Sequence, residues 1–316
     1  MLLGHETAWR EWRKALGGER MHHAWLLAGR RGVGKGSFAF AAACELVGVD
    51  PADAQNHPDI LTLTYAPKDD KEERKRADGK PYEVARSIRI AQVRGMQARL
   101  GTRPTLGDKR AIIIDPADDL ERNAANALLK SLEEPPIGTY FLLVAHSPAR
   151  LLPTIRSRCR VLRFPTVSDA EMDRLLADLS LGADTATRAA AIAAAGGSPG
   201  AALQFVDMEL GKVRQAMDAI LARGDPDFQL RGTLAGLIGA RPDRERIRAV
   251  LELARSAVAQ RLDGAMADPR PVIDTHSELV RLTGEQPTYN FDAGLLAMEI
   301  GTLLAKAATA SERADG

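Results

Sequence analysis

A glycine-rich segment near the start of the chain has the residue types and spacing of a phosphate-binding loop. After the apolar run 24–28 it carries three glycines and a lysine: Gly29, Gly32, Gly34 and Lys35. Such glycines let main-chain N–H groups surround a phosphate, and the lysine can reach the β- and γ-phosphates of a nucleotide. The pattern G-x-x-x-x-G-K-[ST] ends in a hydroxyl residue that binds Mg²⁺. This chain has Gly36 there, so the pattern predicts a nucleotide site that lacks one magnesium ligand.

An acidic position further along the chain is the expected second half of such a site. The β-branched run 111–114 ends in Asp115, and an Asp at the carboxyl end of a parallel strand is typical of a residue that orders Mg²⁺ through water. In active ATPases of this architecture a Glu follows and polarises the attacking water. Here the next residue is Pro116, which has no acid. Two catalytic parts are therefore absent, which favours a site that binds ATP or ADP without hydrolysis, or a relic of one.

A cluster of basic residues follows the next apolar run. Its members are Arg156, Arg158, Arg160 and Arg163. Packing does not explain so many arginines on a short element, and in ring ATPases an arginine at this place reaches into the neighbouring subunit's site. Its charge there accelerates phosphoryl transfer by a factor on the order of 10³–10⁵. The alternative is a salt bridge to an acid on the same chain.

Two histidines lie beside these segments. His57, in the turn before Asp59, has no second His or Cys nearby, which favours a turn or capping role over a metal ligand. His146 follows the apolar run 140–145, where an active enzyme presents Thr or Asn to the γ-phosphate. A hydrogen bond from His146 to phosphate is one interpretation, and a structural role is favoured.

Hydrophobic periodicity and turn residues predict an α/β domain over residues 1–166. Strands are expected at 24–28, 60–64, 111–115, 140–145 and 161–164. Helices are expected at 6–17, 37–47, 87–100 and 122–134. Residues 67–80 are a mixed charge run almost without apolar side chains, so we expect a solvated, mobile insertion there.

The rest of the chain is expected to be helical. Ser168-Asp169-Ala170-Glu171 is a capping box that opens a small lid domain, residues 167–207. Residues 208–316 repeat Leu, Ile, Val and Ala at helical spacing without a chemical motif, which favours an all-α oligomerisation domain. Its helices are expected at 209–223, 227–238, 243–267, 270–283 and 290–310.

Composition excludes several classes of protein. Lys and Arg total 43 against 42 Asp and Glu, so the net charge of +1 gives no overall basic field for nucleic acid. A stand-alone nucleic-acid binder that uses Arg89, Arg94, Arg99 and Arg103 is an alternative that this balance disfavours. Two cysteines without CxxC spacing, no signal peptide and no span of about 18 apolar residues predict a soluble cytoplasmic protein without membrane contact.

These motifs together resemble the clamp-loader branch of the AAA+ ATPases. The resemblance rests on the segments 22–27, 29–35, 57–59, 126–136 and 154–159. The Asn126-Ala-Leu-Leu-Lys block and the Ser157-Arg158-Cys159 triplet are very specific together, and the similarity covers residues 1–205. It implies an AAA+ phosphate-loop domain with a parallel sheet, a helical lid and an all-α collar.

The resemblance also implies a function. Members form a five-subunit ring that loads a sliding clamp on primed DNA, so the implied partners are motor subunits of the γ/τ type, a δ subunit, the clamp and DNA. Arg158 would be donated in trans to ATP on an adjacent motor. Gly36, Pro116 and Gly200, which replaces a sensing arginine, favour a non-motor stator in the bacterial cytoplasm; the alternative is an active motor ATPase. The resemblance implies a zinc site in many members, held by four cysteines in the loop before the His-Pro-Asp turn; residues 48–58 contain no cysteine, so we expect no zinc here.

Overall fold

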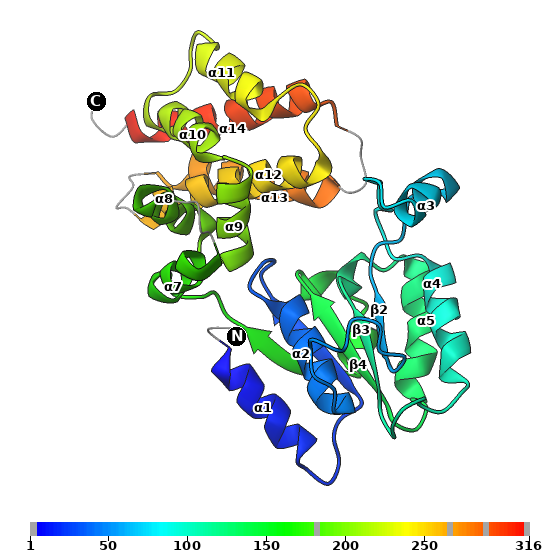
Figure 1. The fold of residues 1–316 in the computed structure, drawn as a ribbon. Helices are drawn as coiled ribbons and strands as arrows, with labels where there is room; N and C mark the ends of the chain where they lie inside the picture. The colour runs from blue at the N-terminus through cyan, green and yellow to red at the C-terminus, as the bar shows by residue number, and fades with distance from the viewer. Residues whose placement is uncertain (1–4, 180–183, 264–267, 287–290, 313–316) are drawn as a thin grey trace. The chain divides into compact units, whose positions relative to one another are not determined.

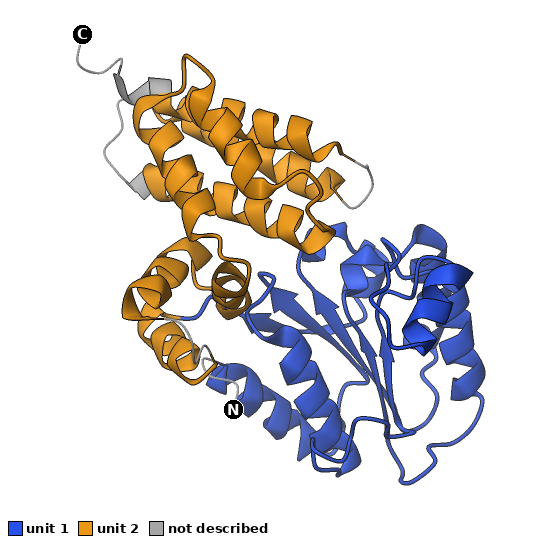
Figure 2. Cartoon of the chain, turned by 45° about the horizontal axis from the view of Figure 1, so that its top comes forward, with its two compact units in different colours: residues 1–167 blue, residues 168–316 orange. Residues whose placement is uncertain are grey.

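The computed structural model describes residues 5–179, 184–263, 268–286 and 291–312. The chain forms two compact units, which are coloured separately in Figure 2: unit 1 comprises residues 1–167 and unit 2 residues 168–316. The segments expected as lid and collar both belong to unit 2. None of the helices in the described ranges combines the length and apolar character that crossing a membrane requires.

Unit 1 is built on a parallel sheet. Among the described residues the sheet has five strands in the order β2-β3-β4-β1-β5. The strands are β1 (Ala24–Gly29), β2 (Ile60–Leu63), β3 (Arg110–Ile114), β4 (Thr139–Ala145) and β5 (Arg160–Phe164). Their continuous apolar runs, rather than alternating ones, are typical of strands covered on both faces.

Helices cover both faces of this sheet (Figure 1). They are α1 (Glu6–Leu16), α2 (Lys35–Val47), α4 (Ile90–Leu100), α5 (Arg122–Glu133) and the short α6 (Pro153–Arg156). Successive strand residues point to opposite faces, so Leu27 packs with α1 and α2 around Trp12 and Phe38. Leu26 packs on the other face, where α4 and α5 contribute Met96 and Leu128. The predicted α/β class is confirmed.

The insertion expected to be mobile contains a helix, α3 (Asp70–Ala77). The carboxylate of Asp69 caps it by accepting the N–H groups of Lys71 and Glu72 at 3.0 Å. Glu72 is buried and accepts the N–H of Glu83 at 2.7 Å, which ties the helix to the chain that leaves it. Nothing in the sequence indicated a helix at residues 70–77; a cap and one buried acid hold one there although the segment lacks an apolar face.

Unit 2 is helical throughout its described residues. Its helices are α7 (Asp169–Leu179), α8 (Thr185–Ala195), α9 (Pro199–Asp207), α10 (Gly211–Arg223), α11 (Gln229–Ile238), α12 (Arg244–Ala259), α13 (Arg270–Glu285) and α14 (Ala293–Glu312). The predicted capping box is present: Ser168 N–H donates to Glu171 at 3.1 Å, and Glu171 N–H donates to the Ser168 hydroxyl at 3.4 Å. The helix expected at 243–267 ends at Ala259 and is followed by a 3₁₀ turn. Residues 264–267 of that prediction, and residue 290 of the helix expected at 290–310, lie outside the described residues.

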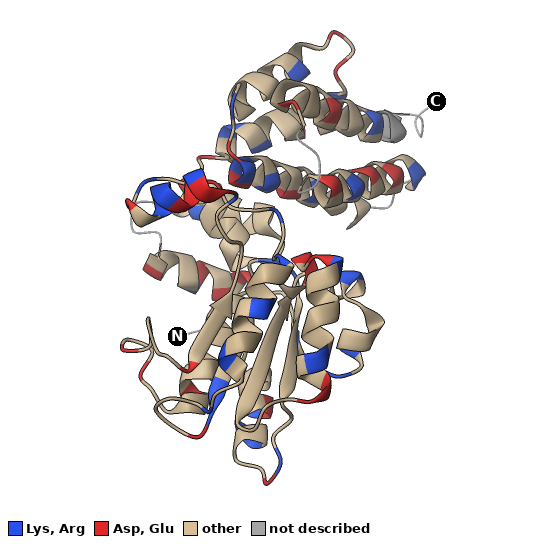
Figure 3. Cartoon of the chain, turned by 90° about the vertical axis from the view of Figure 1, so that its right-hand side faces the viewer, with Lys and Arg blue, Asp and Glu red and all other residues tan. Residues whose placement is uncertain are grey.

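A buried ion pair links the helices of unit 2. Arg231, on α11, lies 3.2 Å from the fully buried carboxylate of Asp225 and donates to the Thr302 hydroxyl of α14 at 3.2 Å. Gly301 makes room for it, since a Cβ atom there would lie 2.7 Å from Cγ of Arg231. Basic and acidic residues alternate along the ribbon of both units (Figure 3), in keeping with the balanced composition.

Candidate functional site

The phosphate-loop segment has the predicted strand–loop–helix context. It leaves β1 at Gly29 and enters α2 at Lys35. Gly32 and Gly34 have φ angles of 78° and 99°, a region that side chains with a Cβ atom rarely adopt. Gly29 is required for another reason: a Cβ atom there would lie 2.3 Å from the carbonyl oxygen of Phe164 on β5. The backbone of the loop therefore explains the three glycines without reference to a ligand.

Lys35 is turned toward the loop itself. Its side chain is buried, and its ammonium group donates hydrogen bonds to the carbonyl oxygens of Gly29 at 2.7 Å and Arg30 at 2.6 Å. Burial lowers the pKa of Lys35 to about 8, although the carboxylates of Asp115 and Asp118 act in the opposite direction. A phosphate would have to replace these carbonyl oxygens as the partner of the lysine.

Asp115 lies beside the residue where the expected hydroxyl is absent. A Cβ atom on Gly36 would be 2.6 Å from Oδ2 of Asp115, so the carboxylate takes the space in which a Ser or Thr side chain would begin. Burial raises the pKa of Asp115, and the charges of Lys35 and Arg31 oppose that rise. The two halves of the predicted site are therefore together, but the acid fills the position of the other magnesium ligand.

A further acid, Asp118, follows Pro116 and has a structural task. Its buried carboxylate accepts the N–H groups of His146 at 3.1 Å and Ser147 at 2.7 Å, which fixes the turn after β4. An acid that is bound to main-chain donors in this way is poorly placed to replace the missing glutamate as a general base. No local pattern in the sequence set Asp118 apart, because its partners are nearly thirty residues away. Nε2 of His146 lies 3.9 Å from Oδ1 of Asp115.

The segment before α1 also contacts the loop. His5 is buried, its Nε2 is hydrogen-bonded to the carbonyl oxygen of Val33, and its ring meets that of Phe164 edge to face at 4.8 Å. No motif or spacing in the sequence indicated this contact. The phosphate loop is thus covered by a residue from the beginning of the chain.

The predicted trans arginine has a partner on its own chain. A guanidinium nitrogen of Arg158 lies 2.6 Å from Oε1 of Glu133 on α5, and another donates to the carbonyl oxygen of Thr154 at 2.9 Å. Both charged side chains are partly exposed, at 35% for Arg158 and 49% for Glu133. The salt bridge that the sequence left open as an alternative is present, and donation to a neighbouring subunit stays a prediction.

Strand direction separates Arg158 from the loop of its own chain. In the β1–β5 pair, Gly29 is opposite Phe164 and Trp25 is opposite Arg160. The loop therefore leaves the sheet where β5 ends, whereas Arg158 precedes the residue at which β5 begins. About 13 Å of strand, at ~3.3 Å per residue, separates these two ends of the sheet. Arg158 therefore cannot contact a phosphate bound in the loop of its own chain. A mechanism within a single subunit would require that contact.

The turn at His57 serves the fold. Nδ1 of His57 accepts the N–H of Asp59 at 3.2 Å, in agreement with the favoured turn role. Asp59 is buried, pairs with Arg110 at 3.4 Å and accepts the N–H groups of Thr105 and Leu106 at 2.7 and 2.8 Å. Burial raises the pKa of Asp59, but these N–H groups and Arg110 outweigh it, so the net shift is downward.

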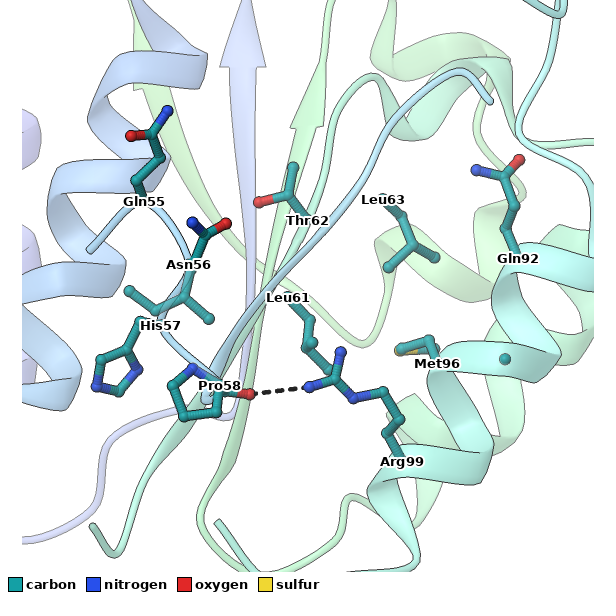
Figure 4. Close-up of a pocket in the computed structure, with 12 residues that line it drawn as sticks. Gln55, Asn56, His57, Pro58, Leu61, Thr62, Leu63, Gln92, Met96 and Arg99 are labelled. Carbon is teal, nitrogen blue, oxygen red and sulfur yellow. Dashed lines mark hydrogen bonds between the residues drawn. The ribbon is translucent and has the colours of Figure 1, made fainter. Parts of the chain in front are cut away.

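An open groove of about 510 Å³ runs along the edge strand β2 (Figure 4). Two side chains of α4 that line it bind main chain: Gln92 donates to Thr64 at 2.7 Å and Arg99 donates to Pro58 at 3.2 Å, in both cases to a carbonyl oxygen. Arg89 likewise donates to the carbonyl oxygen of Lys68 at 2.7 Å. Two of the four arginines in the nucleic-acid alternative thus bind main chain.

Comparison with known proteins agrees with this architecture. A crystal structure of a DNA polymerase III gamma subunit-related protein from Thermotoga maritima matches with a TM-score of 0.50 at 17% identity, covering 96% of this chain and 99% of that one. At this level of identity the likeness concerns the fold alone.

Sequence comparison is more specific. The family model described as "DNA polymerase III, delta subunit" matches residues 4–168. The delta' subunit of Pseudomonas aeruginosa is 37% identical over 167 residues, which are 47% of this chain and 46% of the relative. The delta' subunit of Escherichia coli is 30% identical over 233 residues, 69% and 64% of the two chains. The chain belongs to the DNA polymerase III delta' family of clamp-loader subunits, and it spans about half to two thirds of the length of these relatives.

Proposed function

We propose that this chain is the stator of a bacterial DNA polymerase III clamp loader and that it donates Arg158 in trans to ATP held by an adjacent motor subunit. Its partners would be γ/τ-type motors and a δ subunit in the cytoplasm. The sliding clamp and primed DNA would be met through the assembled ring. Family membership supports the role in the complex, and the site supports the division of labour within it.

The observation that carries the proposal is the position of Arg158. Arg158 lies near the end of the sheet opposite to the phosphate loop, and its side chain is 35% exposed. An arginine so placed is available to another chain's nucleotide and not to its own. Guanidinium groups bind phosphate oxygens through paired, fixed hydrogen bonds, which suits them to stabilise the charge of a transferring phosphoryl group.

The phosphate loop supports the non-motor assignment. Lys35 is bound to loop carbonyl oxygens, Asp115 fills the space next to Gly36, and Pro116 carries no acid. We therefore propose that the chain hydrolyses no ATP by itself. ATP or ADP binding without turnover is compatible with the retained glycines and requires Lys35 to exchange its partners; we propose no zinc or other required cofactor.

The test uses a ring reconstituted from this chain, its motor subunits and δ, with clamp and primed DNA. Arg158→Ala should lower DNA-stimulated phosphate release while size-exclusion chromatography shows the ring intact. Arg156→Ala is the matched control, because Arg156 is an exposed arginine two residues away. Unchanged turnover with Arg158→Ala would leave this residue only its salt bridge to Glu133 and contradict the proposal.

The isolated chain tests the alternative of an active motor. Labelled ATP with Mg²⁺ measures binding, and phosphate release measures turnover. We expect no release from the wild type. Turnover that Lys35→Ala abolishes would identify a working ATPase and overturn the stator assignment.

A further inference from the structure

We infer that Glu133 is a positioning residue that holds Arg158 in a resting position, from which the neighbour's nucleotide must release it. The inference rests on the proposed donation of Arg158 in trans. To that proposal the inference adds Glu133 as a second residue. The guanidinium group of Arg158 binds either the carboxylate of Glu133 in its own chain or a phosphate of the nucleotide in the neighbouring subunit.

The contacts of Arg158 divide into a local and a distant set. The local contact is the hydrogen bond that Arg158 donates to the carbonyl oxygen of Thr154, which lies on α6, four residues earlier in the chain. The ion pair with Glu133, at 2.6 Å, crosses to the end of α5. The distant contact can therefore break while the local one still holds the arginine near its place. Partial exposure of both charged groups means that no core has to open for this exchange.

Glu133 lies where a helix favours a cation. It is the last residue of α5, and Glu134 follows as the C-cap. The unpaired carbonyl groups at a helix C-terminus make this end negative, so two carboxylates there are unfavourable without a positive partner. Arg158 supplies such a partner, in addition to Lys130 in the last turn of α5. The attraction explains why the guanidinium group rests on Glu133 in a chain without a neighbour.

The same ion pair weakens the arginine as a ligand for phosphate. A guanidinium group in contact with a carboxylate has much of its charge offset, and it attracts a second anion less. A nucleoside triphosphate carries more charge than one carboxylate and accepts paired hydrogen bonds. It can therefore displace Glu133 from the guanidinium group of Arg158. The competition lowers the apparent affinity of the neighbour's site for ATP, because part of the binding free energy breaks the resting pair.

Glu133→Gln in the reconstituted ring tests this competition. An exposed ion pair contributes up to about 1 kcal/mol, which is about fivefold in an equilibrium. We therefore expect the half-saturating ATP concentration for DNA-stimulated turnover to fall by about two- to fivefold, with maximal turnover nearly unchanged. Glu134→Gln is the matched control: it removes the neighbouring exposed acid and leaves the pair intact.

Two further variants separate the inference from the proposed function. Glu133→Gln should have no effect on the half-saturating ATP concentration when Arg158 is already Ala. Glu133→Asp, which keeps the charge, should remain closer to the wild type than Glu133→Gln. A half-saturating ATP concentration that is unchanged or higher with Glu133→Gln would overturn the inference while Arg158→Ala still lowers turnover. If Arg158→Ala changes nothing, the proposed function fails, and the inference fails with it.

Discussion

Gly36 and Asp115 share one small volume: a side chain at residue 36 would begin 2.6 Å from the carboxylate of Asp115. The missing hydroxyl and the position of the acid are therefore a single structural feature. A motor subunit needs both groups around Mg²⁺, whereas this backbone leaves room for one of them in the observed arrangement. Restoring the phosphate-loop pattern requires the acid to rotate away.

A double-mutant cycle should reveal this shared volume. Gly36→Ser alone is expected to lower the free energy of unfolding by about 1 kcal/mol, because Asp115 must give way. In an Asp115→Ala background the same change should be neutral or slightly stabilising, since Ser is a better helix former than Gly. Urea unfolding of the four proteins gives the coupling energy. Additive effects would contradict the shared volume.

Lys35 should give stability a distinctive dependence on pH. Its pKa falls from 10.5 to about 8 in the folded chain because of burial, so the unfolded chain binds more protons between these values and stability rises with pH across that window. Below pH 8 the full penalty of burying the cation is present. The free energy of unfolding of the wild type should rise relative to Lys35→Met between about pH 8 and 10.5 and stay parallel to it below pH 7. Parallel curves throughout would mean that the pKa is ordinary.

The His-Pro-Asp turn should be far more sensitive than the surface ion pairs. Asp59→Ala leaves the buried guanidinium of Arg110 with carbonyl oxygens but no carboxylate and should cost about 3–5 kcal/mol, the range for breaking a buried pair. Glu83→Gln, which removes the exposed Lys68–Glu83 pair, should cost no more than about 1 kcal/mol. Chemical denaturation of both variants checks the contrast, and similar losses would refute it.

Two helical glycines of unit 2 should respond oppositely to alanine. Gly301→Ala places a Cβ atom against Arg231 and should destabilise by about 1–3 kcal/mol. Gly236, on α11, has open space around it, so Gly236→Ala should be neutral or stabilise by up to about 1 kcal/mol. Thermal unfolding compares the two directly. Stabilisation by Gly301→Ala would show that Arg231 does not depend on this gap.

Local patterns were sufficient for most of the elements. The helix expected at 6–17 spans Glu6–Leu16, and the strand–loop–helix at Gly29 follows from residue type and spacing alone. The helix expected from residue 87 begins at Ile90 instead. Ile88 is buried and exchanges main-chain hydrogen bonds with residues 119 and 121, and such a distant pairing overrides helix propensity without leaving a local signal.

The site was predictable only where its chemistry is carried by spacing. Lys35 and Asp115 follow from motif and strand pattern. The partners that decide what they do are distant in sequence: Asp118 binds the turn at Ser147, and Glu133 binds Arg158. An acid on a helix end looks the same in the sequence whether it faces solvent or a cation. Only the folded chain distinguishes the two.

The contact of His5 with Val33 has a practical consequence for the measurement of nucleotide binding. A peptide tag that carries histidines or acids and reaches the phosphate loop would compete for the main-chain group that His5 binds. Protein from which such a tag has been cleaved is therefore the appropriate material for an ATP titration. His5→Ala, compared under the same conditions, would report whether this cover regulates access to the loop.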